Sequence, residues 1–376
     1  MRILFCCDSF PGRFSVLASS LAARGHEVLF ASHYGRRDFA LAGVHRVLLK
    51  PVREASPLKR AVLAARQARS AFLTLRGSGF SPDIVLFSAS SGIPLWVHEV
   101  FPNALACGYA DSAPRTADFD EEAEQAAMLR QALLSRCHAV FAFSAESRRA
   151  LPFQLRRSAH VLPAFVDTDF FSPEAARPLD LGGRTFPQSG ELVTMDMRPH
   201  SESAVEPRAV WELALGLLSH RPASFVLLNC ASPELRQQVE RLSERLPEAW
   251  RARLAVQGYR SLDEWRDRLP ASALLVLPEA DAAQGVSAEA LEALSCATPV
   301  AVLSREAGKA ADGLRVLCAS SERRLFQLCE MLEEVRTRPG LGASLRAHVL
   351  KRFAPSLSLA AHIEELEAMH RGHASA

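Results

Sequence analysis

The sequence lacks the features of several protein classes. In 376 residues there is no apolar run of eighteen, so no membrane-spanning helix is predicted. The N-terminus, MRILFCCDSFPGRF, has no charged region followed by an apolar core and a small-residue cleavage site, which argues against a signal peptide. Its 44 basic and 42 acidic residues nearly balance, which argues against a general nucleic-acid binder. The length exceeds that of one ordinary core and favours two domains.

The chain also lacks a cysteine pair at metal-binding or redox spacing. Its eight cysteines are scattered, and none forms a C-x-x-C pair. Zinc-ribbon and thioredoxin-type sites are therefore not supported. Free, buried thiols in a reducing compartment predict a cytoplasmic protein.

Charge is unevenly distributed. Residues 1–80 hold 13 lysines and arginines against 4 acids, a net charge of +9, and the remainder carries −7. The segment Pro57–Arg76 mixes arginines with apolar side chains. One reading is a helix lying on an anionic membrane, such as the inner face of the plasma membrane. The other is an ordinary amphipathic helix with a solvated basic side.

Short apolar runs alternate with segments of helical periodicity throughout the chain. This pattern predicts an α/β protein with doubly wound parallel sheets. A stretch rich in proline and glycine, Ser172–Gly190, interrupts the alternation and is interpreted as a linker. Two facing Rossmann-like domains are expected, with a ligand cleft between them. The predicted boundaries are 1–171 for the first domain, 172–190 for the linker, 191–353 for the second domain and 354–376 for a C-terminal helix and tail.

Several phrases follow one another along the chain in a recognisable order. They are SFPGRF and ARGHEV near the N-terminus, Pro82-Asp83, EVFP at 99–102, Tyr109, VDTDFFSP at 166–173, EALSCATPV at 292–300 and VLKRF at 349–353. This ordered set resembles the GT-B glycosyltransferases of family 4, and more narrowly a subgroup whose N-terminus reads like NFPGQF. The resemblance covers nearly the whole chain and implies the GT-B fold, with a C-terminal helix that crosses back to the first domain.

The resemblance also implies a donor site, bound mainly by the second domain. Glu292 matches the glutamate that holds the donor ribose, because a carboxylate can accept hydrogen bonds from two neighbouring hydroxyls. The alternative is a solvent-facing helix glutamate. Gly285, Val286 and Ser287 match the start of a helix that points toward the diphosphate.

Two further places match the donor site less specifically. Gly12, in the turn after the first strand, matches a position near the phosphates and the acceptor, and the alternative is a simple turn glycine. Gly258 and Tyr259 follow a strand where the family cradles the nucleotide base, and a plain turn is the alternative there.

The sequence departs from the family pattern at the donor site. Gln284 stands eight residues before Glu292, where the family has a second glutamate, and it is expected to contact the donor sugar. Arg198 matches the arginine that neutralises the leaving diphosphate. Ser203 occupies the position of the usual lysine. Asp111 either orients an acceptor hydroxyl or caps a turn.

Two functions remain open at this point. The first is a retaining glycosyltransferase that moves a sugar from a nucleoside diphosphate sugar to a glycan, lipid-linked or protein acceptor, with no metal required. The second is a non-catalytic relative that acts as a partner or scaffold of an active glycosyltransferase. A nucleotide-sugar epimerase shares the architecture and is a further alternative.

Overall fold

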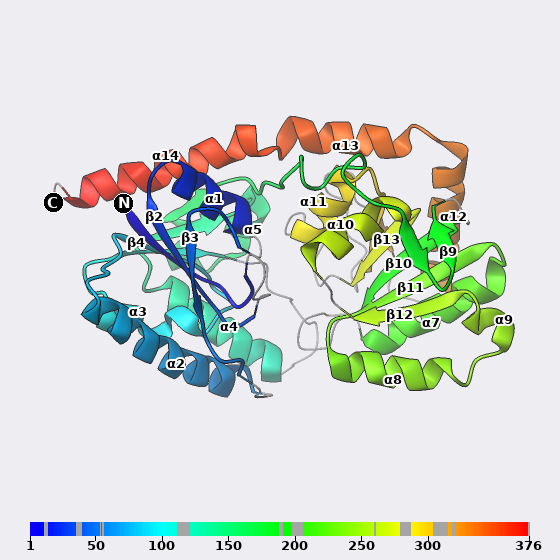
Figure 1. Cartoon of the computed structure of the whole chain (residues 1–376), viewed down its shortest axis with the longest axis horizontal. Helices are drawn as coiled ribbons and strands as arrows, with labels where there is room; N and C mark the ends of the chain where they lie inside the picture. Colours follow the sequence, from blue (N-terminus) through cyan, green and yellow to red (C-terminus); the bar gives the residue numbers. More distant parts are fainter. Residues whose placement is uncertain are drawn as a thin grey trace. The chain divides into compact units, whose positions relative to one another are not determined.

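The computed structural model describes residues 1–10, 14–34, 40–52, 54, 56–110, 121–187, 191–197, 206–258, 261–278, 287–303, 315–317 and 321–374. They form two compact units (Figure 1). The first contains the described residues up to Ala164 and those from Pro355 onward. The second contains the described residues between Phe165 and Ala354. The predicted α/β fold with two Rossmann-like units is confirmed.

The first unit is built on a seven-stranded parallel sheet in the order β3-β2-β1-β4-β5-β6-β7. Its central strands are apolar on both faces, as in β4, IVLFS, whose five residues are all buried, whereas the edge strands β3 and β7 also carry polar, exposed residues. The strands are β1 Arg2–Cys6, β2 Glu27–Ser32, β3 Val44–Leu48, β4 Ile84–Ser88, β5 Leu105–Tyr109, β6 Ala139–Ala142 and β7 Ala159–Val161. The helices are α1 Ser15–Ala23, α2 Pro57–Gly77, η2 Ile93–Trp96, α3 Val97–Val100, α4 Glu121–Leu134, α5 Ala145–Ala150, α6 Phe153–Arg156 and α14 Pro355–Ala374.

The last helix, α14, belongs to the first unit although it ends the chain. It packs against α1 (Figure 1). Its inner side buries His362, Ile363 and Leu366, and the His362 ring stacks parallel to Tyr109 with 6.0 Å between centroids. The predicted return of the C-terminal helix to the first domain is therefore confirmed.

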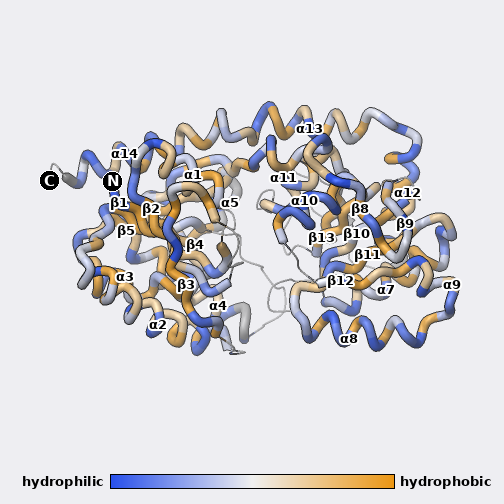
Figure 2. The backbone as a smooth tube through the Cα atoms, viewed as in Figure 1, coloured by the Kyte–Doolittle hydropathy of each residue, from blue (hydrophilic) through white to orange (hydrophobic). Residues whose placement is uncertain are grey.

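The second unit has a six-stranded parallel sheet in the order β12-β11-β10-β13-β14-β15. Its strands are the most apolar segments and its outer helices are more polar (Figure 2). The strands are β10 Glu191–Met197, β11 Ser224–Cys230, β12 Leu254–Gly258, β13 Leu274–Pro278, β14 Val300–Leu303 and β15 Arg315–Leu317. The helices are α7 Pro207–His220, α8 Pro233–Ser243, α9 Glu248–Arg251, α10 Leu262–Ala271, α11 Ala288–Ser295, α12 Ser321–Thr337 and α13 Leu341–Arg352.

The segment predicted as a linker is part of the second unit. Two short antiparallel strands, β8 Leu179–Leu181 and β9 Arg184–Phe186, form a hairpin there. Gly182 and Gly183 both have positive φ, 56° and 80°, which is the backbone that a two-residue hairpin turn requires. Phe186, 1% exposed, buries in the core of this unit. The glycine pair was read as linker composition, whereas it forms a turn.

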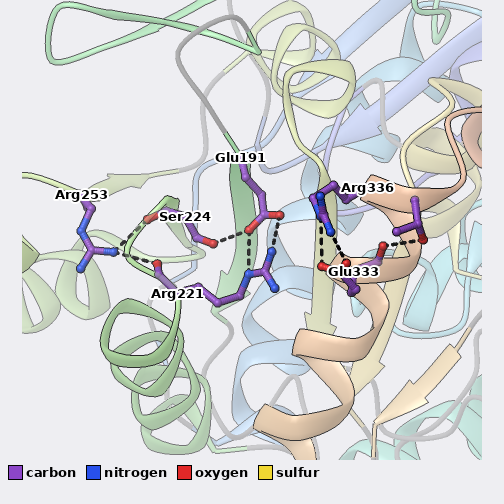
Figure 3. A network of polar contacts seen from close by, with 7 residues as sticks. Glu191, Arg221, Ser224, Arg253, Glu333 and Arg336 are labelled. Atoms are coloured by element: carbon purple, nitrogen blue, oxygen red, sulfur yellow. Dashed lines mark hydrogen bonds and ion pairs between the residues drawn. The ribbon is translucent and has the colours of Figure 1, made fainter.

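A polar network closes the edge of the second sheet where the strands begin. Arg221 forms a bidentate ion pair with Glu191 at the start of β10, through Nε at 3.2 Å and Nη2 at 3.1 Å (Figure 3). Glu191 also accepts from the Ser224 hydroxyl at the start of β11. Arg253 Nη1 donates to the carbonyl oxygens of Arg221 at 3.0 Å and Ser224 at 3.2 Å. This edge is therefore occupied by structural contacts, and the opposite edge carries the candidate site.

Ala297, directly after α11, has φ 62°, in the left-handed region. The phrase at 292–300 resembles a family phrase with glycine at this position. This conformation is about 1–2 kcal/mol less favourable for a residue with a Cβ atom. Glycine avoids that strain, although it loses more backbone entropy on folding.

We therefore expect Ala297→Gly to raise the free energy of unfolding by about 1 kcal/mol, measured by urea denaturation. Ala293→Gly, the same change inside α11, is the matched control and should lower stability by about 1 kcal/mol or more. Equal destabilisation by both variants would show that the backbone at Ala297 is not strained.

Candidate active site

The candidate site lies where the strands of the second sheet end. All six strands run parallel, so their carboxyl ends share one edge, which is where ligands bind in open α/β sheets. Among the predicted site residues, Arg198 directly follows β10, Gly258 ends β12, and residues 284–287 come after β13 in the sequence. Of the predicted residues, Gly258, Ser287 and Glu292 are described. The others lie outside the described residues: Gly12, Asp111, Arg198, Tyr259, Gln284, Gly285 and Val286.

Helix α11 positions two of the predicted residues. Ser287 is its N-cap, with extended backbone, and its hydroxyl accepts from the Ala290 amide at 3.1 Å. This cap stabilises the first turn and defines where the helix begins. The inner face of α11 is apolar and completely buried, as Ala290 and Ala293 show at 0% exposure. Glu292 therefore has a fixed position one turn into a well-anchored helix.

The Glu292 carboxylate is held by an indole. Its Oε2 accepts a hydrogen bond of 2.7 Å from Nε1 of Trp265, which lies on α10 and is 8% exposed. Glu292 itself is half-buried. A hydrogen bond to a charged acceptor in such surroundings restricts the carboxylate to one orientation. These contacts argue against a simple solvent-facing glutamate, and its ribose-binding role stays a prediction.

Helix α10 is fixed in turn by a buried arginine. Arg268, 2% exposed, donates from Nη1 to Oδ1 of Asn229 at 2.7 Å. Asn229 Nδ2 donates to Oδ1 of Asp196 at 2.9 Å. Asp196 on β10 and Asn229 on β11 are partners in the sheet register, each one residue before its strand ends. Trp265 and Arg268 are one turn apart on α10, so the anchor and the indole lie on the same side of this helix.

Two hydroxyl groups donate hydrogen bonds to carbonyl oxygens in the last turn of α10. Ser272 Oγ donates to the carbonyl oxygen of Arg268 at 2.8 Å, and Thr298 Oγ1 donates to that of Leu269 at 2.6 Å. Pro270 lies inside this last turn and has no N–H to offer. Thr298, from the phrase that contains Glu292, therefore joins the end of α10 to the chain that follows α11.

The phrase at 166–173 also supports α10 and α11. Ser295 Oγ, at the end of α11, donates to the carbonyl oxygen of Phe171 at 2.6 Å. The Arg266 guanidinium of α10 lies over the Phe170 ring, 4.8 Å from its centroid. Asp167 Oδ1 accepts from the Phe170 amide at 2.9 Å and so closes a local turn. This stretch packs within the second unit as a brace for the helix pair.

Cys296, which directly follows α11, lacks the low pKa of a reactive cysteine. Burial, reinforced by the negative charge of Glu292, raises the pKa of its thiol to about 12. The thiol therefore remains protonated at neutral pH. Among the described residues, no group of three or more His, Cys, Asp or Glu is placed to hold a metal ion.

Gly258, at the end of β12, tolerates a side chain. Among the described residues, a Cβ built there would meet only the Arg236 Cδ, at an ordinary contact distance of 3.7 Å. Sterics therefore do not require glycine, and its base-cradling role stays a prediction.

Sequence reasoning missed Trp265 and Arg268. The segment LDEWRDRLPA gives an amphipathic helix, but it does not indicate that one of its two arginines, Arg268, is almost completely buried. A tryptophan near a helix end was the available signal, since a buried indole N–H needs an acceptor.

Removing the buried guanidinium should destabilise the second unit. Arg268→Met leaves Asp196 and Asn229 buried without the guanidinium. We therefore expect the free energy of unfolding, measured by urea denaturation, to fall by about 3–5 kcal/mol. Arg236→Met removes an exposed arginine paired with Glu240, and it should lower the free energy of unfolding by at most about 1 kcal/mol. A loss below 1 kcal/mol for Arg268→Met would show that α10 does not depend on this contact.

Comparison with known proteins shows the fold and a family match for part of the chain. Residues 24–160 match the model of the glycosyl transferase family 4 group. A search of curated proteins found no match. Among solved structures, HepE from Anabaena, in complex with UDP and glucose, is 15% identical with a TM-score of 0.66, over 98% of this chain and 100% of that one.

Two other structures have the same fold. Sucrose-phosphate synthase from Thermosynechococcus elongatus is 14% identical with a TM-score of 0.69, over 98% of this chain and 99% of the other. WaaG, a glycosyltransferase involved in lipopolysaccharide biosynthesis, is 16% identical with a TM-score of 0.62, over 92% and 95%. The resemblance seen in the sequence is thereby supported: the chain has the GT-B fold of these structures, residues 24–160 match the glycosyl transferase family 4 group model, and this match on that fold indicates a glycosyltransferase.

Proposed function

We propose that the protein transfers a sugar from a nucleoside diphosphate sugar to a glycan, lipid-linked or protein acceptor, with retention of anomeric configuration. The observation that carries this proposal is the Glu292 carboxylate, oriented by Trp265 on the helix that starts at the carboxyl edge of the second sheet. Uridine is the first base to test, because structures of HepE, which has the same fold, contain UDP, UDP with glucose, or UDP-glucose.

In this proposal Glu292 binds the ribose of the donor. A carboxylate offers acceptor sites on both oxygens and can receive two hydroxyls of a vicinal diol. The hydrogen bond from Trp265 restricts the motion of the carboxylate before the ligand binds. Such preorganisation reduces the entropy lost on binding.

The diphosphate is assigned to the loops that follow the strands. Arg198 comes directly after β10 and is proposed to stabilise the charge that develops on the leaving group. Gly285, Val286 and the N-cap Ser287 lead into α11, where amides and the helix dipole favour an anion. Gly12 is proposed to lie near the phosphates, as the resemblance implies.

The remaining predicted residues are assigned to the sugar, the base and the acceptor. Gln284 contacts the donor sugar, Gly258 and Tyr259 face the base, and Asp111 orients the acceptor hydroxyl. No metal is part of this proposal, and magnesium is varied in the experiment below.

A second function is favoured by two departures from the family pattern. Gln284 replaces a glutamate, and Ser203 stands where a phosphate-binding lysine is usual. Losing one such donor typically costs about 3–4 kcal/mol of transition-state stabilisation, which is a hundredfold or more in rate. The protein would then keep the fold, with or without nucleotide binding, and would act as a partner or scaffold of an active glycosyltransferase.

The test is thermal unfolding in the presence of UDP, GDP, CDP, dTDP and their sugars, with and without magnesium. A ligand at 100 times its Kd should add about 2.7 kcal/mol to the folded state. We expect one nucleotide family, uridine first, to raise the Tm. Glu292→Gln should abolish the shift, and Trp265→Phe should weaken binding about tenfold by releasing the carboxylate.

Matched variants separate a lost site from lost stability. Glu234→Gln removes an exposed carboxylate from the first turn of α8, and Trp250→Phe alters a half-buried indole in the same unit. Both should bind nucleotide like the unchanged protein. Binding unaffected by Glu292→Gln, or no shift with any nucleotide, would overturn the donor site. Binding without sugar transfer or donor hydrolysis would favour the partner function.

A further inference from the structure

The basic helix α2, for which a membrane contact was one of two readings, packs largely into the core of the first unit. Phe72 of α2 is completely buried and lies 5.9 Å from Phe101, ring to ring. Arg69 pairs with Glu99 at 3.2 Å. Of the large apolar residues in α2, only Val62 and Leu63 are exposed, at 39% and 38%. The structure therefore favours the reading of α2 as an ordinary amphipathic helix. No helix in the described part of the chain is long and apolar enough to cross a membrane.

A different surface combines an exposed aromatic ring with positive charge. Phe153, the first residue of α6, is 69% exposed, the highest value among the large apolar side chains of the described residues. Four exposed arginines share with it a shallow hollow of about 360 Å³. This Phe153 patch consists of Phe153, Arg148, Arg149, Arg156 and Arg157. It lies outside residues 1–80, where the charge count located the positive excess.

The backbone beneath the patch is firmly held. Leu151 and Leu155, each 8% exposed, point into a core cluster of the first unit. Arg156 Nε donates to the Leu151 carbonyl oxygen at 2.9 Å, and Arg148 Nε donates to that of Arg156 at 3.1 Å. The segment thus buries its leucines while Phe153 stays in water. Leaving a phenylalanine exposed forgoes the stabilisation that its burial would provide.

We propose that the Phe153 patch docks on the surface of an anionic lipid bilayer. Guanidinium groups form bidentate contacts with lipid phosphates, and an aromatic ring between them can enter the boundary between headgroups and acyl chains. Residues 145–157 carry four arginines and one glutamate, a net charge of +3 that complements an anionic leaflet. An acidic peptide would satisfy the arginines, but it would give the exposed ring no apolar phase to enter. The bilayer accounts for both features.

The experiment is co-sedimentation of the full chain with phosphatidylcholine vesicles, with and without phosphatidylglycerol. We expect binding only to the anionic vesicles, weakening as salt is raised. Phe153→Ser and the double variant Arg149→Gln/Arg157→Gln should each reduce binding about tenfold. Arg148 and Arg156 are left intact because they brace the backbone.

Matched controls locate the effect. Phe326→Ser removes an equally exposed ring, 64%, from α12 of the second unit, and Lys59→Gln/Arg66→Gln removes two charges from α2. Both should bind vesicles like the unchanged protein, and all variants should keep its Tm. The proposal is overturned if the α2 variant alone loses binding, or if Phe153→Ser binds normally. Binding to poly-glutamate with no binding to anionic vesicles would also overturn it, and would indicate an acidic protein partner.

Discussion

A buried charge must be matched by partners that are buried with it, and this requirement organises the second unit. The Arg268 guanidinium reaches Asn229, which reaches Asp196, so one helix is tied to two neighbouring strands through side chains alone. Removing one partner would leave the others desolvated and unsatisfied, which makes alternative placements of α10 costly. One turn away, the same helix presents Trp265 to Glu292. The orientation of the candidate ribose-binding carboxylate thus follows from a buried contact that touches no ligand.

The amino and carboxyl ends of the strands in the second sheet carry different kinds of residues. Where the strands begin, Glu191, Arg221 and Arg253 satisfy one another and nearby carbonyl groups. Where they end, the buried polar pair Asp196 and Asn229 lies just beneath the edge, and the predicted site segments follow. Rigidity at one edge and chemistry at the other is the arrangement expected for a site built on an open parallel sheet.

The fold was predictable because its signals are local and repeated. Runs such as RILFC and IVLFS, alternating with helical periodicity, specify a parallel α/β sheet, and the ordered phrases identify the GT-B architecture. The hairpin at 179–186 was missed because Gly182 and Gly183 have the same composition in a turn as in a linker. Glu292 was found from its phrase, but its partner was not, because Trp265 lies 27 residues earlier and meets it only in the folded chain.

Surface properties were the least predictable. The sequence places a positive excess in the first 80 residues, yet it does not tell which side chains face water. Phe72 and Phe153 both stand near arginines in the sequence, and one is 0% exposed whereas the other is 69% exposed. That difference depends on which neighbours each helix packs against. Because Phe153 is the exposed ring, we place the proposed membrane contact at α6 and not at α2.

Hydrogen–deuterium exchange of the full chain, with and without saturating UDP, tests most directly whether the second unit carries the donor site. Slower exchange should appear in peptides that cover the start of α11, the end of β12 and α10. Peptides at the opposite edge of the sheet, around Arg221 and Arg253, should exchange unchanged. Protection confined to the first unit, or no protection at any UDP concentration, would contradict a nucleotide site organised by Trp265 and Glu292.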